Sequence, residues 1–169
     1  MGILGAACAE ALVALGFDVA GWSRSPKSIA GVDGFTGSEG LKPFLARSEI
    51  LVCLLPLTAE TEDILDREAF ASMPQGGFLI NAGRGRHVVD ADLLTALDSG
   101  QIAGAALDVF RTEPLPADHP FWTHPKIRIT PHIAALVNEE SATATIVDTI
   151  RRLRDGRKLL NVADPARGY

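Results

Sequence analysis

Residues 1–25, MGILGAACAEALVALGFDVAGWSRS, lead from a pair of glycines into an Ala- and Leu-rich segment and then into a short apolar strand. Gly2 and Gly5 have the spacing of the last two glycines of G-x-G-x-x-G, the turn that lets a pyrophosphate approach the start of a helix. The first glycine of that pattern would fall before the first residue. Because free amide groups and the helix dipole favour an anion at such a helix start, we predict that Gly2, Ile3 and Leu4 contact a dinucleotide.

The strand that follows ends in a basic turn, WSRSPK at residues 22–27, which contains no carboxylate. In dinucleotide folds, an acidic residue about 20 positions after the glycines binds the ribose of NAD, whereas a nearby arginine accommodates the 2′-phosphate of NADP. Arg24 suits a phosphate because its guanidinium forms parallel hydrogen bonds. The turn therefore predicts a preference for NADP(H), with NAD(H) as the second choice; a solvated basic turn without a ligand is the alternative. The predicted contacts are Trp22, Ser23, Arg24, Ser25 and Lys27.

Short apolar runs alternate with amphipathic segments along the rest of the chain. The runs at 18–22, 49–55, 77–82, 102–110 and 127–130 are nearly continuous in hydrophobicity, as in a parallel sheet with helices on both faces. Helices are predicted at 5–15, 38–47, 62–73, 91–99 and 139–155, with Thr61, Asp90 and Asn138 as N-caps and Gly16, Gly100 and Gly156 as stops. This alternation predicts a doubly wound, mostly parallel α/β sheet of Rossmann type over residues 1–155.

The composition excludes several classes of protein. The chain has 169 residues, 47% of them hydrophobic and 22% charged, and a formal net charge of −5, which indicates a globular domain and disfavours nucleic acid as a partner. It has no apolar run of about 18 residues and no basic region before its first apolar stretch, so we expect a cytoplasmic protein without a membrane span or secretion signal. Cys8 and Cys53 lie in apolar surroundings without a clustered histidine, which predicts free thiols and no metal site.

Polar residues follow three of the predicted strands, where open α/β sheets bind their ligands. Arg84 lies in LINAGRGRHVV, Asp108 and Glu113 lie in ALDVFRTEPLP, and His132 lies in ITPHIAA. Histidine is the side chain best suited to proton transfer near neutral pH. We therefore predict that a basic residue, two acids and a histidine converge on one crevice. The remaining histidines, His87, His119 and His124, are interpreted as structural.

Three motifs in this order, N-x-x-R-G, D-V-F-x-x-E-P-L-P and T-P-H-I-A-A, resemble those of the nucleotide-binding domain of the D-isomer-specific 2-hydroxyacid dehydrogenases. WSRSPKS, LLPLTAET and the terminal ARGY are most similar to the glyoxylate/hydroxypyruvate reductase A branch of that family. The resemblance covers essentially the whole chain. It implies an oxidoreductase that reduces a small 2-oxo acid, such as glyoxylate or hydroxypyruvate, with hydride from NADPH.

The resemblance also implies a role for each site residue. Arg84 would bind the carboxylate and carbonyl of the 2-oxo acid, and His132 would protonate the developing alkoxide. Glu113 would hydrogen-bond the imidazole and fix its tautomer, while Asp108 would anchor the nicotinamide carboxamide. The other residues expected at the cofactor are Leu55, Pro56 and Thr61 on the adenosine side, with Ala82, Gly83, Arg84, His132 and Ala134 near the nicotinamide.

The family has two domains, and the resemblance implies a substrate domain that normally precedes this segment and to which residues 156–169 would return. We therefore expect this sequence to be the C-terminal part of a longer dehydrogenase, inactive alone, with unpaired strand edges where the first strand would lie. The family's members dimerise through this domain, which implies a homodimer. Two alternatives remain: a catalytically silent dinucleotide-binding or corepressor-like module, and a methyltransferase, which has no use for N-x-x-R-G and T-P-H.

Overall fold

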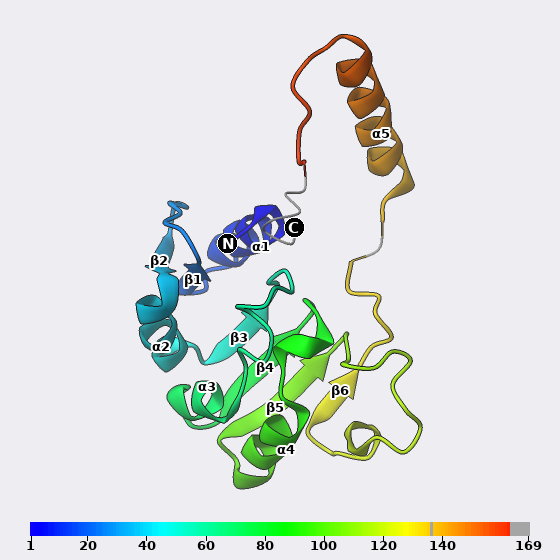
Figure 1. Cartoon of the computed structure of the whole chain (residues 1–169). Helices are drawn as coiled ribbons and strands as arrows, with labels where there is room; N and C mark the ends of the chain where they lie inside the picture. The colour runs from blue at the N-terminus through cyan, green and yellow to red at the C-terminus, as the bar shows by residue number, and fades with distance from the viewer. Residues whose placement is uncertain (136, 163–169) are drawn as a thin grey trace.

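The computed structural model describes residues 1–135 and 137–162 (Figure 1). Helices and strands alternate along the chain, as the sequence predicts. In order they are α1 (Ile3–Ala14), β1 (Val19–Ser23), β2 (Val32–Thr36), α2 (Gly37–Arg47), β3 (Ile50–Cys53), α3 (Arg67–Ser72), β4 (Gly77–Asn81), η1 (Gly85–His87), α4 (Asp90–Ser99), β5 (Ile102–Leu107), η2 (Pro120–Trp122), β6 (Ile127–Ile129) and α5 (Glu139–Arg154).

The strands form two parallel sheets, one of β1 and β2 and the other in the order β3-β4-β5-β6. Parallel neighbours require crossover connections. Helices α3 and α4 lie in the connections from β3 to β4 and from β4 to β5, whereas residues 24–31 and 108–126 connect β1 to β2 and β5 to β6 without an α-helix. Within the described residues, β1 and β3 each pair with one strand only, so each leaves one edge unpaired. This arrangement confirms the Rossmann-type α/β prediction and shows the strand order interrupted between β1 and β3.

The core lies on one face of the four-stranded sheet, against α3 and α4 (Figure 1). Leu93 and Leu97 of α4 and Ile102 of β5 are fully buried there. On β3 and β4 the burial alternates, since the residues that point away from this core are exposed: Ile50 by 53%, Val52 by 39%, Phe78 by 48% and Ile80 by 38%. The prediction of helices on both faces therefore holds for one face of these strands in the described part of the chain.

Three local predictions were wrong. The short strand β2 was missed, because Asp33, Gly34 and Thr36 interrupt VDGFT and leave no continuous apolar run. The helix predicted at 62–73 begins only at Arg67 and is capped by Asp66, whose carboxylate accepts from the Ala69 amide. Asp90 lies inside α4 rather than capping it, because Val89 occupies the N-cap position.

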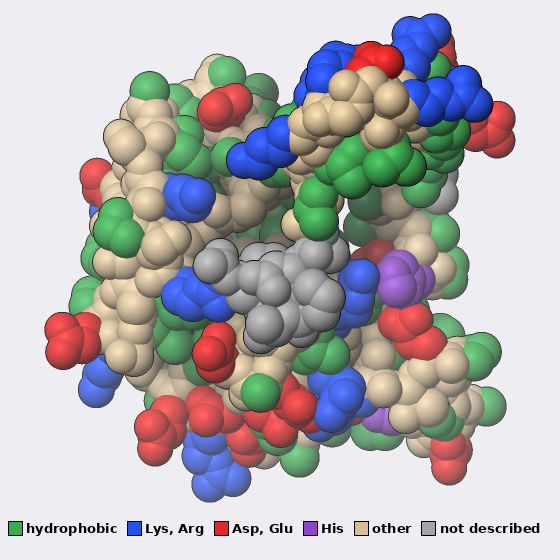
Figure 2. Space-filling model, turned by 45° about the horizontal axis from the view of Figure 1, so that its top comes forward, with side chains coloured by type: hydrophobic (Ala, Val, Ile, Leu, Met, Phe, Trp, Pro, Cys, Tyr) green, Lys and Arg blue, Asp and Glu red, His purple; other side chains and the backbone are tan. Residues whose placement is uncertain are grey.

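Helix α5 stands apart from the sheets (Figure 1), and none of its residues is buried. Asn138 caps it as predicted, since its side chain accepts from the Ser141 amide at 2.9 Å. Ile146, Ile150 and Leu153 are exposed by 59%, 46% and 69%, and Figure 2 shows hydrophobic side chains on the surface of this helix beside blue Lys and Arg side chains. The tail predicted over 156–169 is described only to residue 162, and the terminal ARGY lies outside the described residues.

Candidate active site

The turn after β4 carries Arg84, and two buried side chains hold its backbone. Asn81, 1% exposed, donates from Nδ2 to the Arg84 carbonyl at 3.0 Å and accepts from the Gly83 amide at 3.1 Å. His87 is fully buried, and its Nδ1 accepts from the Arg84 amide at 3.1 Å. The Arg84 side chain itself is exposed, and its guanidinium donates to the Gly83 carbonyl. The structure thus fixes the main chain of the N-x-x-R-G motif and leaves the charged end accessible.

Gly85 brings this turn against the segment after β5. A Cβ built on Gly85 would lie 1.8 Å from the carbonyl carbon of Phe110, so no other residue fits there without displacement of the main chain. The electrostatic influence of Arg84 reaches Glu113 and contributes to lowering the pKa of that carboxyl. The close approach at Gly85 is therefore what gathers the basic residue and the acid of two separate motifs.

Glu113 and His132 form a direct pair, as the family resemblance implies. Glu113 Oε2 lies 2.8 Å from His132 Nδ1, and Oε1 accepts from the Phe110 amide at 3.0 Å. The hydrogen bond with His132, followed by that from Phe110, lowers the pKa of Glu113 below its ordinary value. An ionised carboxylate accepts only, so Nδ1 carries the hydrogen and donates it. This leaves Nε2 of the half-exposed imidazole as the nitrogen that can exchange a proton.

Asp108 organises the loop that carries His132. Its Oδ1 accepts from the Thr130 hydroxyl at 2.5 Å and the Ile133 amide at 2.9 Å, and its Oδ2 accepts from the Ala134 amide at 2.9 Å. Burial opposes ionisation, but these hydrogen bonds outweigh it and lower the pKa of Asp108.

His132 lies within this loop at φ 56°, in the left-handed region that non-glycine residues rarely adopt. Its amide donates to the carbonyl of Asp108 at 2.9 Å. The Asp108 carboxylate thus holds the residues on both sides of His132, whose backbone is strained. The sequence did not predict this structural role for Asp108.

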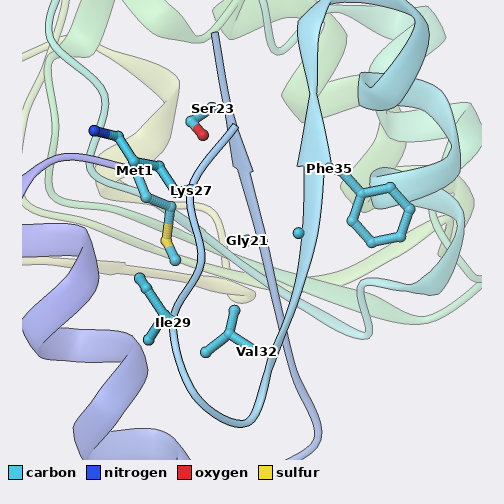
Figure 3. A pocket seen from close by; sticks show the side chains of 8 residues that line it. Met1, Gly21, Ser23, Lys27, Ile29, Val32 and Phe35 are labelled. Carbon is cyan, nitrogen blue, oxygen red and sulfur yellow. The ribbon is translucent and has the colours of Figure 1, made fainter. Parts of the chain in front are cut away.

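The predicted start of the phosphate site lies at the N-terminus of α1. Gly2 is the N-cap, no side-chain hydrogen bond caps the helix, and a Cβ added at Gly2 would meet nothing within 4 Å. Met1 lies nearby against β1: its ammonium donates to the Trp22 carbonyl at 3.2 Å, and its side chain contacts Gly21. Figure 3 shows it in a small pocket beside Lys27 and Ile29. The helix start is therefore open above an unpaired strand edge.

The basic turn lies at the carboxyl end of β1. Ser23 is buried, and its hydroxyl donates to the Ser25 carbonyl at 2.8 Å, which fixes the turn. Trp22 donates from Nε1 to the Gly37 carbonyl at 2.8 Å, which ties β1 to the start of α2. Arg24 is exposed, and its guanidinium lies 3.9 Å from the carboxylate of Glu60. The sequence prediction missed this acid because it lies 36 positions further along the chain.

The loop after β3 brings the predicted adenosine-side residues together. Thr61 is buried, accepts from the Thr58 amide at 2.8 Å and donates to the Pro56 carbonyl at 2.7 Å. Its hydroxyl is therefore used within the loop and does not cap a helix, which corrects the predicted role. His87 Nε2 also lies 3.2 Å from the Pro56 carbonyl, so this loop and the Arg84 turn share a histidine.

The structure therefore separates the predicted residues into two groups. Arg84, Asp108, Glu113, His132 and Ala134 gather at the carboxyl ends of β4, β5 and β6, joined through Ala82 and Gly83 to the Leu55–Pro56–Thr61 loop. Gly2, Ile3 and Leu4 lie at α1, with Trp22, Ser23, Arg24, Ser25 and Lys27 at β1. Asn81, Thr130 and Glu60 were not predicted. The side-chain contacts of Asn81 lie within its own turn, whereas Thr130 and Glu60 contact residues 22 and 36 positions away.

Neither cysteine is in a disulfide: Cys8 is half-buried, Cys53 is buried, and burial raises the pKa of the Cys53 thiol to about 11. Within residues 1–135 and 137–162, no three acidic, histidine or cysteine residues are placed to hold a metal ion. Over the same residues, no helix has the length and apolarity to cross a membrane.

The fold and the site define a dinucleotide-binding domain of Rossmann type with a carboxylate–histidine pair at the carboxyl ends of its strands. Residues 1–134 match the family model described as D-isomer specific 2-hydroxyacid dehydrogenase, NAD binding domain. The chain belongs to this family, as the sequence motifs indicate.

The chain is also similar to individual members of this family whose activity is named. Over 168 residues the chain is 49% identical to glyoxylate/hydroxypyruvate reductase A of Serratia proteamaculans, covering 99% of the chain and 54% of the relative. It is similar to a D-isomer specific 2-hydroxyacid dehydrogenase of Xanthobacter autotrophicus solved with NADPH and MES (TM-score 0.96, 49% identity, 99% of this chain and 69% of that one).

A second solved structure is that of an NADPH-dependent glyoxylate/hydroxypyruvate reductase of Sinorhizobium meliloti, solved with NADP and sulfate. Its TM-score is 0.95 and its identity 42%, over 100% of this chain and 55% of that one. The chain thus spans about half the length of the curated relatives it matches.

Proposed function

We propose that this chain is the nucleotide-binding and proton-donating part of an NADPH-dependent reductase of small 2-oxo acids such as glyoxylate and hydroxypyruvate. The observation that carries the proposal is the Glu113–His132 pair at 2.8 Å, beside the turn that presents Arg84. Relatives bearing this activity are 49% and 42% identical, and solved ones hold NADPH or NADP. The matched segment is 54% of the Serratia relative and 55% of the Sinorhizobium one, so the proposed activity is the one named for those longer proteins.

Each side chain has a defined task in this proposal. Arg84 binds the substrate carboxylate through its exposed guanidinium and polarises the neighbouring carbonyl. His132 gives the proton on Nε2 to the oxygen of that carbonyl, while Glu113 holds Nδ1–H and keeps the ring oriented. When bound, the dinucleotide supplies the hydride. A corepressor-like module has no use for this proton donor, so the retained pair favours the enzyme.

The residues at α1 and β1 fit a phosphorylated dinucleotide. The uncapped start of α1 at Gly2 offers amide groups to a pyrophosphate, and Arg24 and Lys27 offer positive charge to a 2′-phosphate. Glu60 opposes a phosphate at Arg24, but an ion pair at 3.9 Å between exposed groups is worth about 0–1 kcal/mol. We therefore propose NADP(H) as the preferred cofactor. We also propose that the Asp108 carboxylate, which accepts the hydrogen bonds of the His132 loop, binds the nicotinamide carboxamide.

We propose a cytoplasmic protein that works as a homodimer. The apolar side chains exposed on β3 and β4, with those on α5, offer surface that association would bury. Residues 1–155 are proposed as the dinucleotide-binding unit and 156–169 as a segment that leads to the second domain of the family. Size-exclusion chromatography with light scattering tests the dimer, and a monomeric mass at micromolar concentration would contradict it.

A fusion tests the catalytic assignment. The N-terminal portion of the Serratia reductase that this chain does not match is joined to Met1, and NADPH oxidation is followed with hydroxypyruvate and glyoxylate. We expect turnover that His132→Ala reduces at least about 100-fold, as loss of a general acid does. His124→Ala is the matched control, because His124 pairs with Asp98 on α4 and should leave the rate unchanged. Equal rates for the two variants would contradict the role of His132.

A further inference from the structure

Arg84 is an exposed side chain on a main chain that is held from within the protein. Its carbonyl accepts from Asn81, and its amide donates to His87, so both polar groups of the Arg84 backbone are bound to buried side chains. The ring of His87 also packs on Gly83, where an added Cβ would lie 3.1 Å from Nδ1 and 3.2 Å from Cε1. The direction in which Arg84 leaves the turn therefore depends on the position of this ring.

The hydrogen bonds define the tautomer of His87. Nδ1 faces the Arg84 amide, which can only donate, and it lies 3.6 Å from the Cys53 sulfur. Nδ1 is therefore an acceptor and carries no hydrogen. Nε2 faces the Pro56 carbonyl at 3.2 Å, which can only accept, so the hydrogen is on Nε2. A neutral ring with these roles satisfies both partners. In the other tautomer, the Nδ1–H donor would face the Arg84 amide donor, and the unprotonated Nε2 would face the Pro56 carbonyl oxygen.

The same ring therefore links two loops of the candidate site. The Pro56 carbonyl accepts from His87 and from the Thr61 hydroxyl, which fixes the loop after β3. The Arg84 amide fixes the turn after β4 on the other side of the ring. Neighbouring backbone pairs, from Leu65 to His87 and from Asp63 to Arg86, hold η1 in place.

We propose that His87, as the neutral Nε2–H tautomer, is a positioning residue that sets the Arg84 guanidinium relative to the cofactor-side loop at Pro56. The inference rests on the proposed substrate role of Arg84. It assigns a share in carboxylate binding to His87, whose side chain is fully buried. Small displacements of an orienting group have large effects on binding and rate, so the contribution of His87 is measurable through Arg84.

The first test reads the ring directly. The whole chain is labelled with 15N, and long-range proton–nitrogen correlations report which ring nitrogen of His87 carries hydrogen. We expect a protonated Nε2 and an unprotonated Nδ1, and the His87→Gln spectrum assigns the signal. A protonated Nδ1, or a ring charged at pH 7, would overturn the proposal whether or not Arg84 binds substrate.

The second test measures binding of oxalate, which presents a carboxylate next to a second oxygen as a 2-oxo acid does, to the NADP⁺-loaded chain by calorimetry. His87→Leu should weaken oxalate binding about tenfold, because it leaves the Arg84 amide without its acceptor. His87→Gln should restore binding to within about threefold, since its amide offers an acceptor and a donor at similar separation. Thermal unfolding of both variants accompanies the titrations.

A double-mutant cycle separates positioning from a general loss of structure. In an Arg84→Gln background, His87→Leu should weaken oxalate binding no further, because the group that His87 positions is gone. Two results would overturn the inference. The first is that His87→Leu weakens oxalate binding tenfold in both backgrounds. The second is that Arg84→Gln weakens oxalate binding, whereas His87→Leu in the wild-type background does not. If Arg84→Gln itself leaves oxalate binding unchanged, the proposed function of Arg84 fails, and the nitrogen spectrum alone decides the hydrogen bonding of His87. Should His87→Leu not fold, the Gln variant and the spectrum carry the test.

Discussion

Replacement of Asp108 by asparagine tests how the His132 loop is held. The carboxylate accepts from the Thr130 hydroxyl and from the amides of Ile133 and Ala134, and the residue is 6% exposed. Asparagine keeps one acceptor oxygen and turns an NH₂ group toward the Ala134 amide. One hydrogen bond to a charged group is then lost, and a donor faces a donor.

The expected loss follows from those contacts. Leaving a buried donor unsatisfied costs about 1–3 kcal/mol, so we expect Asp108→Asn to lower the free energy of unfolding by about 2 kcal/mol. For a chain of this size, that corresponds to a fall in Tm of about 4–8 °C. His132, at φ 56°, should also relax out of the left-handed region and move away from Glu113. Urea unfolding gives the stability, and the nitrogen spectrum of His132 gives the pairing.

The pH dependence of this difference provides an internal check. The pKa of Asp108 is lowered in the folded protein from its ordinary value of 3.8, so the ionised carboxylate stabilises the fold above pH 3.8. That contribution is lost as the pH falls through the lower, folded pKa. The stability difference between the wild type and Asp108→Asn should therefore shrink below pH 3.8. Asp118→Asn, an exposed change in the segment between β5 and η2, is the control and should alter stability by less than about 0.5 kcal/mol. An equally small effect of Asp108→Asn at pH 7 would show that the Asp108 carboxylate does not stabilise the His132 loop.

Three other changes test separate parts of the site. Gly85→Ala should destabilise the chain by about 3 kcal/mol or prevent folding, because the new Cβ would lie 1.8 Å from the main chain at Phe110. Each kcal/mol lost should lower the Tm by about 2–4 °C, so a Tm within 2 °C of the wild type would contradict this prediction. His132→Ala should raise the pKa of Glu113 toward 4.5, followed by carbon NMR, because the hydrogen bond with the imidazole is the largest cause of its lowered value; an unchanged pKa would mean that the pair does not form. A thiol reagent at pH 8 should modify Cys8 and leave Cys53, with its pKa of about 11, unmodified until urea unfolds the chain; equal reaction rates in the folded protein would contradict the burial of Cys53.

Local signals in the sequence predicted much of the fold. Asn138 before an acidic first turn marks the start of α5, and Gly100, at φ 79°, ends α4. The strand β2 escaped because its polar residues break the apolar pattern. Thr61 failed as a cap because its hydroxyl finds closer partners in its own loop, the competition that Ser and Thr commonly offer to helix formation.

The candidate site was predictable in its residue types and less so in its connections. The family resemblance implied that Glu113 and His132 pair, and the structure places Oε2 and Nδ1 2.8 Å apart. The approach of Glu60 to Arg24 joins residues 36 positions apart, and no local pattern encodes it. Asn81 and His87 each lie three positions from Arg84, so their hydrogen bonds close within one turn, but the sequence motif does not show which groups they join. His87 was interpreted as structural, and its burial agrees; what the sequence did not show is which main-chain groups it holds.

A comparison of NADPH and NADH binding tests whether the basic turn after β1 selects a phosphorylated dinucleotide. The affinity of the chain for each is measured by the fluorescence of the bound nicotinamide, for the wild type, Arg24→Ala and the control Arg67→Ala, an exposed arginine on α3. We predict that NADPH binds at least about tenfold more tightly than NADH, since hydrogen bonds to a charged group are worth about 1.5–3 kcal/mol. Arg24→Ala should abolish that difference, and Arg67→Ala should retain it. Equal affinities for the two nucleotides, unaffected by Arg24→Ala, would contradict the assignment of Arg24 to the 2′-phosphate.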